Sequence, residues 1–335
     1  MTRVRRGAQP GFLPATGWIA ALAIVCSATG AAAQRPTFTS GIDLVHVGVT
    51  ITDDDGNLIT DLTVDDFDVL EDGQPQEISY FSVGLESDAE LIPLHLGLLF
   101  DMSESMGRSE RFQKTAAIRF LNTLTYAADM TVVDFDTEVR VGRYGQADFG
   151  RLIERIRGRR PGGYTALYDA LGVYLDGAFE QDGRKVLVLY TDGEDTRSRL
   201  TIREARDLLR ASDVTVYAVG FQESLRSRQR MRQRMLLNQL TEITGGSSYF
   251  PDTVDELDEI YTRIAAELDG RYSLGFVSAN GRRDGTWREL EVRLRDPDRR
   301  DELRDARVRV REGYFAPWSE AEAEGEAAPD RDDGR

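Results

Sequence analysis

The chain has 335 residues, of which 41% are hydrophobic and 30% charged, and its formal net charge is −16. This length allows two modest domains in addition to processing segments. The acidic balance argues against nucleic acid and anionic membrane surfaces as partners, and it favours solubility and the binding of cations. After residue 35, no apolar run approaches the ~20 residues that a membrane helix needs.

Residues 1–33 have the pattern of an export signal. Three arginines within the first six residues precede a short apolar stretch, which ends in three alanines at 31–33. We therefore predict cleavage after Ala33, no membrane span in the mature chain and a periplasmic or extracellular location; an uncleaved membrane anchor is the alternative. Cleavage would also remove Cys26, the only cysteine, and leave no disulfide or thiol chemistry.

Residues 34–88 are predicted to be rich in β-structure. Valine and isoleucine alternate with other residues over 45–51, which is the period-2 pattern of a half-buried strand. A hairpin is expected around Asp72-Gly73. The acidic run at 53–57 is similar to a calcium loop, but the EF-hand spacing would place Ile51 at the first ligand position. A turn between strands is the better interpretation.

Residues 89–270 follow a different pattern. Nearly continuous apolar runs at 91–100, 185–190 and 214–221 are typical of strands that are buried on both faces. Segments with helical spacing separate these runs. The alternation predicts an α/β fold with a doubly wound, mostly parallel, Rossmann-like sheet.

Residues 271–316 return to period-2 alternation, with charged residues in the intervening positions, as in antiparallel strands with one solvated face. Neither flank is long enough to make a stable core alone. We therefore predict that 40–88 and 271–315 pair into one small β-sandwich, with the α/β domain inserted between them. The tail at 317–335 is acidic and poor in apolar residues, so it is expected to be disordered.

Three separated segments carry the candidate chemistry. The first apolar run is followed by the motif D-x-S-x-S, a Gly-rich loop carries a threonine in GGYTALYDAL, and LYTDGEDT follows the second run. In an open α/β sheet, such loops converge outside the carboxyl ends of the strands. Their functional residues are Asp101, Ser103, Ser105, Thr165 and Asp192. Hydroxyl and carboxylate oxygens are hard donors that select Mg²⁺, Mn²⁺ or Ca²⁺.

These motifs, in this order, resemble the metal-ion-dependent adhesion site of von Willebrand factor A (VWA) domains, over roughly residues 89–270. The resemblance implies that the three hydroxyls bind a divalent ion, foremost Mg²⁺, and that the two carboxylates act directly or through water. Tyr164 departs from the pattern, because many relatives place Gly next to the threonine. The flanks, with ITDLTVDDFDVLEDGQPQEI and GYFAP, resemble an exported bacterial subgroup of VWA-related proteins.

Other interpretations of these residues stay open. Ser103 or Ser105 could cap a helix that begins near Glu110, or the scaffold could no longer bind an ion. Five arginines within 226–234 alternate in a way that spreads them around a helix, which indicates a solvated surface or a docking surface for an acidic partner. A second group, Arg157, Arg159 and Arg160, precedes Thr165 and could pair with acidic groups of a partner.

An enzyme is difficult to build from this sequence. The only histidines, His46 and His95, lie within strand patterns, and only Glu104 or Glu194 could act as a general base beside a metal-bound water. No motif of a hydrolase or a nucleotide-binding enzyme is present. A metallohydrolase is therefore the least favoured hypothesis, and we expect a protein that is not an enzyme.

The favoured function is an exported, metal-dependent, adhesion-type module. Its divalent cation would coordinate an Asp or Glu side chain of a partner protein, and surrounding loops would set specificity. The alternative is a structural component of a cell-envelope assembly, in which the ion only stabilises the fold.

Overall fold

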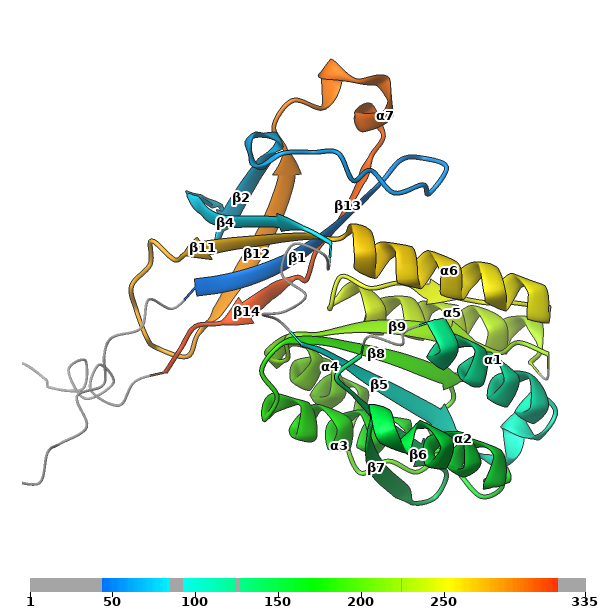
Figure 1. Cartoon of the computed structure of the whole chain (residues 1–335). Helices are drawn as coiled ribbons and strands as arrows, with labels where there is room; N and C mark the ends of the chain where they lie inside the picture. Colours follow the sequence, from blue (N-terminus) through cyan, green and yellow to red (C-terminus); the bar gives the residue numbers. More distant parts are fainter. Residues whose placement is uncertain (1–43, 85–92, 124–126, 224, 319–335) are drawn as a thin grey trace, which may run out of the picture. The chain divides into compact units, whose positions relative to one another are not determined.

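The computed structural model describes residues 44–84, 93–123, 127–223 and 225–318 (Figure 1). The predicted export signal and all but the first two residues of the predicted acidic tail lie outside the described residues. Within these ranges, no helix combines the length and the apolar character needed to cross a membrane.

A six-stranded sheet forms the centre of the α/β domain, with strand order β10-β9-β8-β5-β6-β7. All its pairings are parallel except that of β6 with β7. The strands are β5 (Leu94–Asp101), β6 (Asp129–Phe135), β7 (Val139–Gly145), β8 (Arg184–Thr191), β9 (Val214–Gly220) and β10 (Ser248–Tyr249). The predicted doubly wound, mostly parallel sheet is therefore confirmed.

Helices cover both faces of this sheet (Figure 1). They are α1 (Glu110–Thr123), α2 (Phe149–Gly158), α3 (Leu167–Phe179), α4 (Ile202–Ala211), α5 (Ser227–Glu242) and α6 (Val254–Gly270). Buried side chains of α1, α2 and α6 pack in one hydrophobic cluster with the sheet, and those of α3, α4 and α5 pack in another. Short 3-10 helices lie at Val64–Asp66, Glu104–Gly107 (η2), Gln146–Asp148 and Pro297–Arg299.

The central strand β5 is buried on both faces of the sheet, which requires an uninterrupted apolar run. All eight of its residues are buried. Leu98 packs into the cluster with α1 and α6, whereas the adjacent Leu99 packs into the cluster with α3 and α4. Both faces are therefore apolar. At Gly97, a Cβ atom would lie 2.3 Å from the ring of Tyr174 of α3, so only glycine allows this helix to approach.

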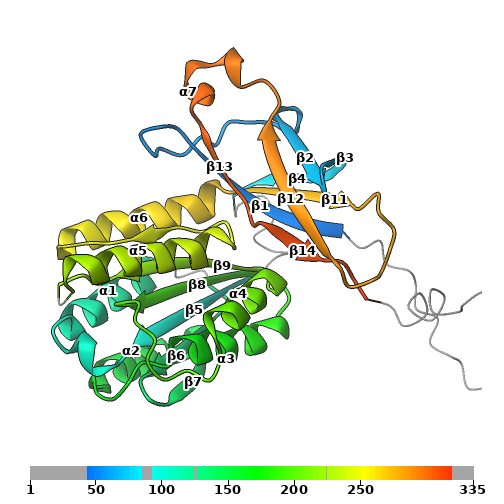
Figure 2. The same cartoon turned by 180° about the vertical axis from the view of Figure 1, so that it is seen from behind.

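Two four-stranded sheets flank the α/β domain in the sequence, with strand orders β13-β1-β11-β4 and β14-β12-β2-β3 (Figure 2). The first contains β1 (Leu44–Thr52), β4 (Ile78–Val83), β11 (Tyr272–Val277) and β13 (Arg307–Arg309). The second contains β2 (Phe67–Glu71), β3 (Gln74–Gln76), β12 (Trp287–Leu294) and β14 (Gly313–Phe315), and a short α7 (Asp301–Arg304) precedes β13.

Each of these sheets combines strands from before and after the α/β domain. Their inward residues share one hydrophobic cluster, to which Val49 and Leu274 contribute from one sheet and Phe67 and Val292 from the other. The predicted sandwich of the two flanks is therefore confirmed. The hairpin around Asp72-Gly73 is also confirmed, because both residues have positive φ angles, 48° and 76°, between β2 and β3.

Candidate metal centre

The candidate site lies where β5 and β8 end. These strands are neighbours in the sheet and run in parallel, so their carboxyl ends lie at the same edge. β5 ends at Asp101, and β8 ends at Thr191, directly before Asp192. In the sheet, β5 lies between β6 and β8, so the strand that follows β5 in the chain is on one side of it and β8 is on the other. This reversal of strand order is the position at which open α/β sheets bind ligands.

The carboxylate of Asp101 is fully buried, with an exposed fraction of 0%. Its Oδ1 accepts a hydrogen bond from the backbone N–H of Ser103 at 3.0 Å, and its Oδ2 accepts one from the hydroxyl of Thr191 at 2.6 Å. Thr191 is itself held by the backbone N–H of Gly193, which donates to Oγ1 at 2.9 Å. The orientation of Asp101 is therefore fixed by groups that carry no charge.

Asp192 is the second buried carboxylate of the site. Its Oδ2 atom is buried and has no hydrogen-bond partner within the described part of the chain. Burial, followed by repulsion from Asp192, raises the pKa of Asp101 to about 7. Burial likewise raises the pKa of Asp192. The protein thus holds two carboxylates close together without neutralising them, which is costly unless a cation is present.

Two serine hydroxyls lie beside these carboxylates. Ser103 Oγ and Ser105 Oγ are 3.0 Å apart, and the hydroxyl of Ser105 lowers the pKa of Asp192 against the larger, opposite effect of burial. Ser103 occupies the N-cap position of η2, but its side chain makes no capping hydrogen bond. Ser105 lies inside η2 rather than at the start of α1. The interpretation of these serines as helix caps is therefore wrong, and both hydroxyls face the site.

Backbone hydrogen bonds connect the Thr165 loop to the other two loops. The N–H of Gly162 donates to the carbonyl of Met102 at 2.8 Å, and on the far side the carbonyl of Thr165 accepts from the N–H groups of Thr196 and Arg197, both at 2.9 Å. Thr165 is buried, with an exposed fraction of 4%. The structure therefore brings the loops of all five predicted site residues to one edge of the sheet.

Tyr164, the residue that departs from the expected pattern, does not disturb this loop. Its backbone N–H donates to Thr137 Oγ1 at 3.0 Å, and its side chain is 65% exposed. The preceding Gly163 has a φ of 79°, and a Cβ atom there would lie 2.5 Å from Thr137 Oγ1. The second glycine is thus required by the turn, whereas the tyrosine points outward.

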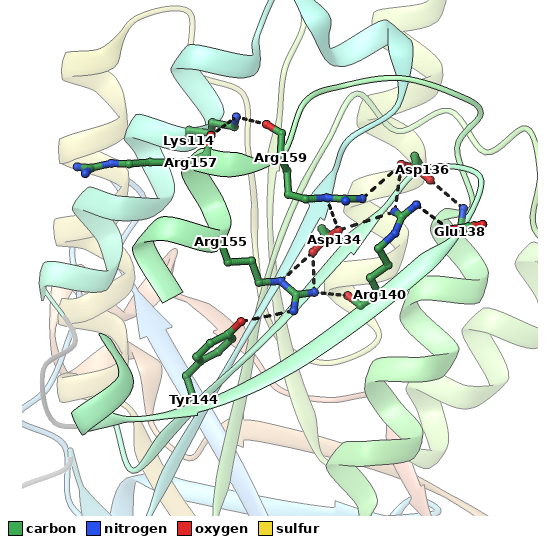
Figure 3. Close-up of polar contacts among 9 residues, drawn as sticks. All are labelled: Lys114, Asp134, Asp136, Glu138, Arg140, Tyr144, Arg155, Arg157 and Arg159. Carbon is green, nitrogen blue, oxygen red and sulfur yellow. Dashed lines mark hydrogen bonds and ion pairs between the residues drawn. The ribbon is translucent and has the colours of Figure 1, made fainter. Parts of the chain in front are cut away.

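A cluster of ion pairs supports the same edge from β6 (Figure 3). Buried Asp134 accepts from Arg155 Nε at 2.9 Å and Nη2 at 2.6 Å, and it pairs with Arg159 Nε at 2.8 Å. Arg140 also reaches this group, with Nη1 3.1 Å from Asp136 Oδ2. This corrects the hypothesis that Arg159 is available to a partner, because it is committed to ion pairs within the chain.

The side chain of Arg157 points away from the Asp134 cluster (Figure 3), and Arg157 and Arg160 are exposed. Lys114 of α1 donates to the carbonyl of Arg157 at 3.0 Å and also to the carbonyl of Arg159. These contacts hold the carboxyl end of α2 in place. They precede the loop that carries Thr165, so the cluster fixes where that loop begins.

Sequence reasoning missed two residues that orient Asp101. Thr191 donates to its carboxylate, and the fully buried Gln113 of α1 donates from Nε2 to its backbone carbonyl at 3.1 Å. Thr191 lies directly before Asp192 in the motif and could have been found as a hydroxyl at the end of a strand. Gln113 carries no comparable signal, because a polar residue near the start of a helix is expected to be exposed.

The candidate residues for catalysis lie at the other edge of the sheet or are exposed. His95 is near the amino end of β5, where Nε2 is 2.9 Å from the carbonyl of Asp182. Glu104 and Glu194 are exposed. The arginines of the 226–234 run are exposed along α5, as expected for a solvated helix. The acidic run at 53–57 forms a turn, in which Asp53 accepts hydrogen bonds from Asn57.

The chemistry of the assembled side chains fits a hard divalent cation. Within the described ranges, no group of three or more histidine, cysteine, aspartate or glutamate residues could hold a metal. A metal at this edge would therefore depend on hydroxyl oxygens in addition to the two carboxylates. Such an oxygen set suits Mg²⁺, Mn²⁺ or Ca²⁺ and not a soft metal. The unpartnered Oδ2 of Asp192 is an atom that a cation would satisfy.

The fold and this edge together define a class of protein: a doubly wound α/β domain with a candidate cation site, lined by oxygen atoms, at the carboxyl ends of its strands. The family model of the von Willebrand factor type A domain matches residues 95–263, which is half of the chain. The chain belongs to this family.

Comparison with other proteins gives distant structural similarity only. No curated protein matches the chain. The conserved hypothetical protein BatB from Bacteroides thetaiotaomicron is similar, with 15% identity, a TM-score of 0.42 and coverage of 52% of this chain and 98% of that one. The vWF domain of the type V pili tip protein Mfa5 from Porphyromonas gingivalis is also similar, with 12% identity, a TM-score of 0.44 and coverage of 53% of this chain and 96% of that one. A von Willebrand factor type A structure from Catenulispora acidiphila shows 14% identity and a TM-score of 0.44, with coverage of 78% of this chain and 76% of that one.

Proposed function

We propose that this protein is an exported protein-binding module that holds a divalent cation, foremost Mg²⁺, and uses it to bind a carboxylate of a partner protein. The observation that carries the proposal is the buried, unpartnered Oδ2 of Asp192 beside a second buried carboxylate, Asp101. A buried charge without compensation is strongly unfavourable. A bound cation would remove this penalty at both carboxylates together.

The donor set also supports an ion that accepts a ligand from outside. Ser103, Ser105 and Thr165 are neutral, so the protein supplies little more negative charge than the two aspartates. An ion held by several carboxylates would have its charge largely compensated by the protein. Here the ion would remain electrophilic toward an additional anionic oxygen, and the Asp or Glu side chain of a partner would provide it.

Residues around the site support a protein as the ligand. Tyr164 is 65% exposed beside Thr165, and the exposed Arg197 donates its backbone N–H to the carbonyl of Thr165. Tyrosine and arginine are the residue types that most often dominate binding energy in protein interfaces. The guanidinium of Arg197 would attract the same acidic segment that the cation binds. A role without catalysis is part of this proposal, as is export through residues 1–33.

Metal binding is tested by isothermal titration calorimetry with Mg²⁺, Mn²⁺ and Ca²⁺. We expect one site in the wild type and no measurable binding in Asp101→Ala. The matched control is Asp176→Ala, because Asp176 is an exposed aspartate of α3. This control should bind like the wild type. Equal binding by wild type and Asp101→Ala would overturn the assignment of the site.

Partner binding is tested by affinity capture from envelope and secreted fractions, with Mg²⁺ or EDTA. We expect partners that are retained only with Mg²⁺ and are lost with Asp101→Ala. Displacement by an excess of a Glu-containing peptide, but not by its Gln analogue, would identify the carboxylate. Identical partner lists under both conditions would refute the proposal. If Asp101→Ala lowered the melting temperature and preserved assembly, the ion would have only the structural role of the alternative hypothesis.

A further inference from the structure

A cavity of about 410 Å³ lies at the opposite edge of the six-stranded sheet from the metal centre. Leu94, Arg184 and Val214 line it, and these are the first residues of β5, β8 and β9. The strands run from this edge to the other, roughly 23 Å over eight residues. β1 and β11 of the sandwich contribute His46 and Ser273 to the lining. The volume is within the range of small-molecule sites.

Basic groups outnumber acidic groups in the lining. The cations are Arg184, Lys185, Arg271 and Arg311, and the carboxylates are Asp182 and Asp213. Lys185 and Asp213 form an ion pair at 2.6 Å and so neutralise each other. In a chain with a net charge of −16, this excess of guanidinium groups is a local reversal of sign. The cavity therefore attracts anions.

Arg271 has only neutral hydrogen-bond partners within the described part of the chain. Its Nη1 donates to Thr215 Oγ1 at 2.6 Å, and its Nη2 donates to the carbonyl of Gly48 at 3.0 Å. Its Nε is buried and has no hydrogen-bond partner. A Cβ atom at position 48 would lie 2.5 Å from this Nε, so a glycine is needed to seat the guanidinium.

Arg311 is another arginine of the lining. Among the described residues its Nε atom is buried without a hydrogen-bond partner, and its guanidinium lies 5.5 Å above the ring of Tyr314. Burial lowers the pKa of both Arg271 and Arg311. The two buried Nε–H groups are unfavourable without acceptors, and an anion between the two guanidinium groups would supply the missing acceptors.

Part of the cavity wall is apolar. Its side chains are Val47, Leu94, Val186, Val214 and Leu268. An inorganic anion would leave this surface without contact, whereas an aliphatic chain would cover it. The cavity thus combines an anion-binding end with an apolar wall, as small-molecule sites commonly do.

We propose that this cavity binds a small organic carboxylate, whose carboxylate group lies between Arg271 and Arg311 and whose aliphatic chain packs on the apolar wall. The site does not depend on the metal centre, because its residues lie at the opposite ends of the strands. It would give this VWA protein a second ligand, of low molecular mass, at the junction of the sandwich and the α/β domain.

The test is calorimetric titration of the full chain in EDTA, so that the metal centre does not contribute. The probes are sodium hexanoate, hexan-1-ol of the same chain length, and inorganic phosphate. We expect saturable one-site binding of hexanoate. Hexanol should bind roughly tenfold more weakly, because it lacks the charge-assisted hydrogen bonds. Phosphate should also bind more weakly, because it cannot use the apolar wall.

The variants are Arg311→Gln and Arg311→Lys, with Arg307→Gln as the matched control, since Arg307 is exposed on β13. Arg311→Gln should lose about tenfold in hexanoate affinity. Arg311→Lys should lose less hexanoate affinity, because lysine keeps the positive charge, although it lacks the planar guanidinium group that can donate two parallel hydrogen bonds. Arg307→Gln should bind like the wild type. Circular dichroism checks that each variant is folded.

Three results would overturn the proposal: equal affinity for hexanol and hexanoate, unchanged hexanoate binding by folded Arg311→Gln, or tighter binding of phosphate than of hexanoate. If Arg311→Gln failed to fold, the comparison of hexanoate with hexanol on the wild type and the behaviour of Arg311→Lys would still decide.

Discussion

Asp101 and Asp134 lie at the carboxyl ends of neighbouring strands, and both are buried, but the protein treats their charges in opposite ways. Asp134 is surrounded by Arg155, Arg159 and Arg140. The side chain of Asp101 accepts hydrogen bonds from a backbone N–H and a hydroxyl, and a second carboxylate repels it.

The difference separates a carboxylate that the chain pairs internally from one that we propose binds a cation. Residue type, burial and place in the sheet are the same, so none of them identifies the site. What distinguishes Asp101 is that the protein orients its oxygens and leaves its charge uncompensated. Such an arrangement is the basis for the proposal that Asp101 binds a cation from solution.

The largest expected effect is on the free energy of unfolding, when Asp134 and Asp101 are each replaced by a neutral residue in separate variants and measured in EDTA. Asp134→Ala should lower the free energy of unfolding by about 3 kcal/mol, the lower end for a broken buried ion pair, because Arg155 and Arg159 are partly exposed. Asp101→Asn should raise the free energy of unfolding, because it removes the repulsion from Asp192. Urea denaturation measures both.

The control for this pair is Glu138→Ala, since Glu138 is the exposed member of the arginine cluster, with 74% of its side chain accessible. Its effect should be within about 0.5 kcal/mol. Destabilisation by both Asp101→Asn and Asp134→Ala in EDTA would remove the distinction between the two carboxylates.

The next effect concerns the orientation of Asp101. Thr191→Val keeps the shape of the side chain but removes the hydroxyl that donates to Asp101 Oδ2 at 2.6 Å. Loss of such an outer partner should weaken Mg²⁺ binding roughly 10–100-fold. Calorimetry measures the affinity, with Thr215→Val of β9 as a control at the other edge. Equal affinities for Mg²⁺ in wild type and Thr191→Val would show that Asp101 is oriented without this hydroxyl.

A smaller effect is expected from pH, because water that enters the metal-free site screens the repulsion. The pKa of Asp101 is raised from 3.8 to about 7, so the folded state binds this proton more tightly than the unfolded state. In EDTA, the contribution of Asp101 to stability is therefore complete below about pH 4. This contribution falls as the pH rises toward 7.

Thermal melts between pH 5 and pH 8 measure this dependence. In EDTA, wild type should lose stability relative to Asp101→Asn as pH rises, and the shift of the melting temperature by Mg²⁺ should grow over the same range, since protons compete with the ion. If the melting temperatures of wild type and Asp101→Asn changed with pH in parallel, the raised pKa of Asp101 would be contradicted.

The smallest effect on the fold is expected at Tyr164. Tyr164→Ala should change stability by no more than about 0.5 kcal/mol, because its side chain is 65% exposed. It should leave Mg²⁺ affinity unchanged and weaken partner binding by about 2 kcal/mol if the tyrosine anchors the partner. Phe179→Ala is the matched control, as an exposed aromatic residue of α3. Unchanged partner affinity would exclude Tyr164 from the interface.

Much of the fold could be predicted, because it depends on patterns that burial imposes directly. Apolar runs identified β5, β8 and β9, and period-2 alternation identified β12, whose buried residues alternate with exposed ones. The need for a sufficient core predicted that the flanks pair. The exchange of strands between the two flanking sheets could not be predicted, since it depends on long-range pairing that local patterns do not encode.

The meeting of the three motif loops at one edge of the sheet was predictable, whereas the side chains that support these loops were not. Asp101, Ser103 and Asp192 follow strands whose ends meet at one edge. The commitment of Arg159 to Asp134 could not be read from the sequence, because a basic run before a loop is the same whether it faces a partner or a carboxylate 25 residues earlier. The cavity at the amino edge carries no motif, because its cations come from three separate segments.

The central claim is that the carboxyl edge of the sheet holds a divalent cation, and titration of Mg²⁺ into wild type and Asp192→Asn tests it most directly. Asp192→Asn keeps the size of the side chain and removes the charge of the unpartnered oxygen. The account predicts one Mg²⁺ site in the wild type and roughly tenfold or greater loss of affinity in the variant. Absence of Mg²⁺, Mn²⁺ and Ca²⁺ binding by the wild type, or equal affinities in both proteins, would contradict it.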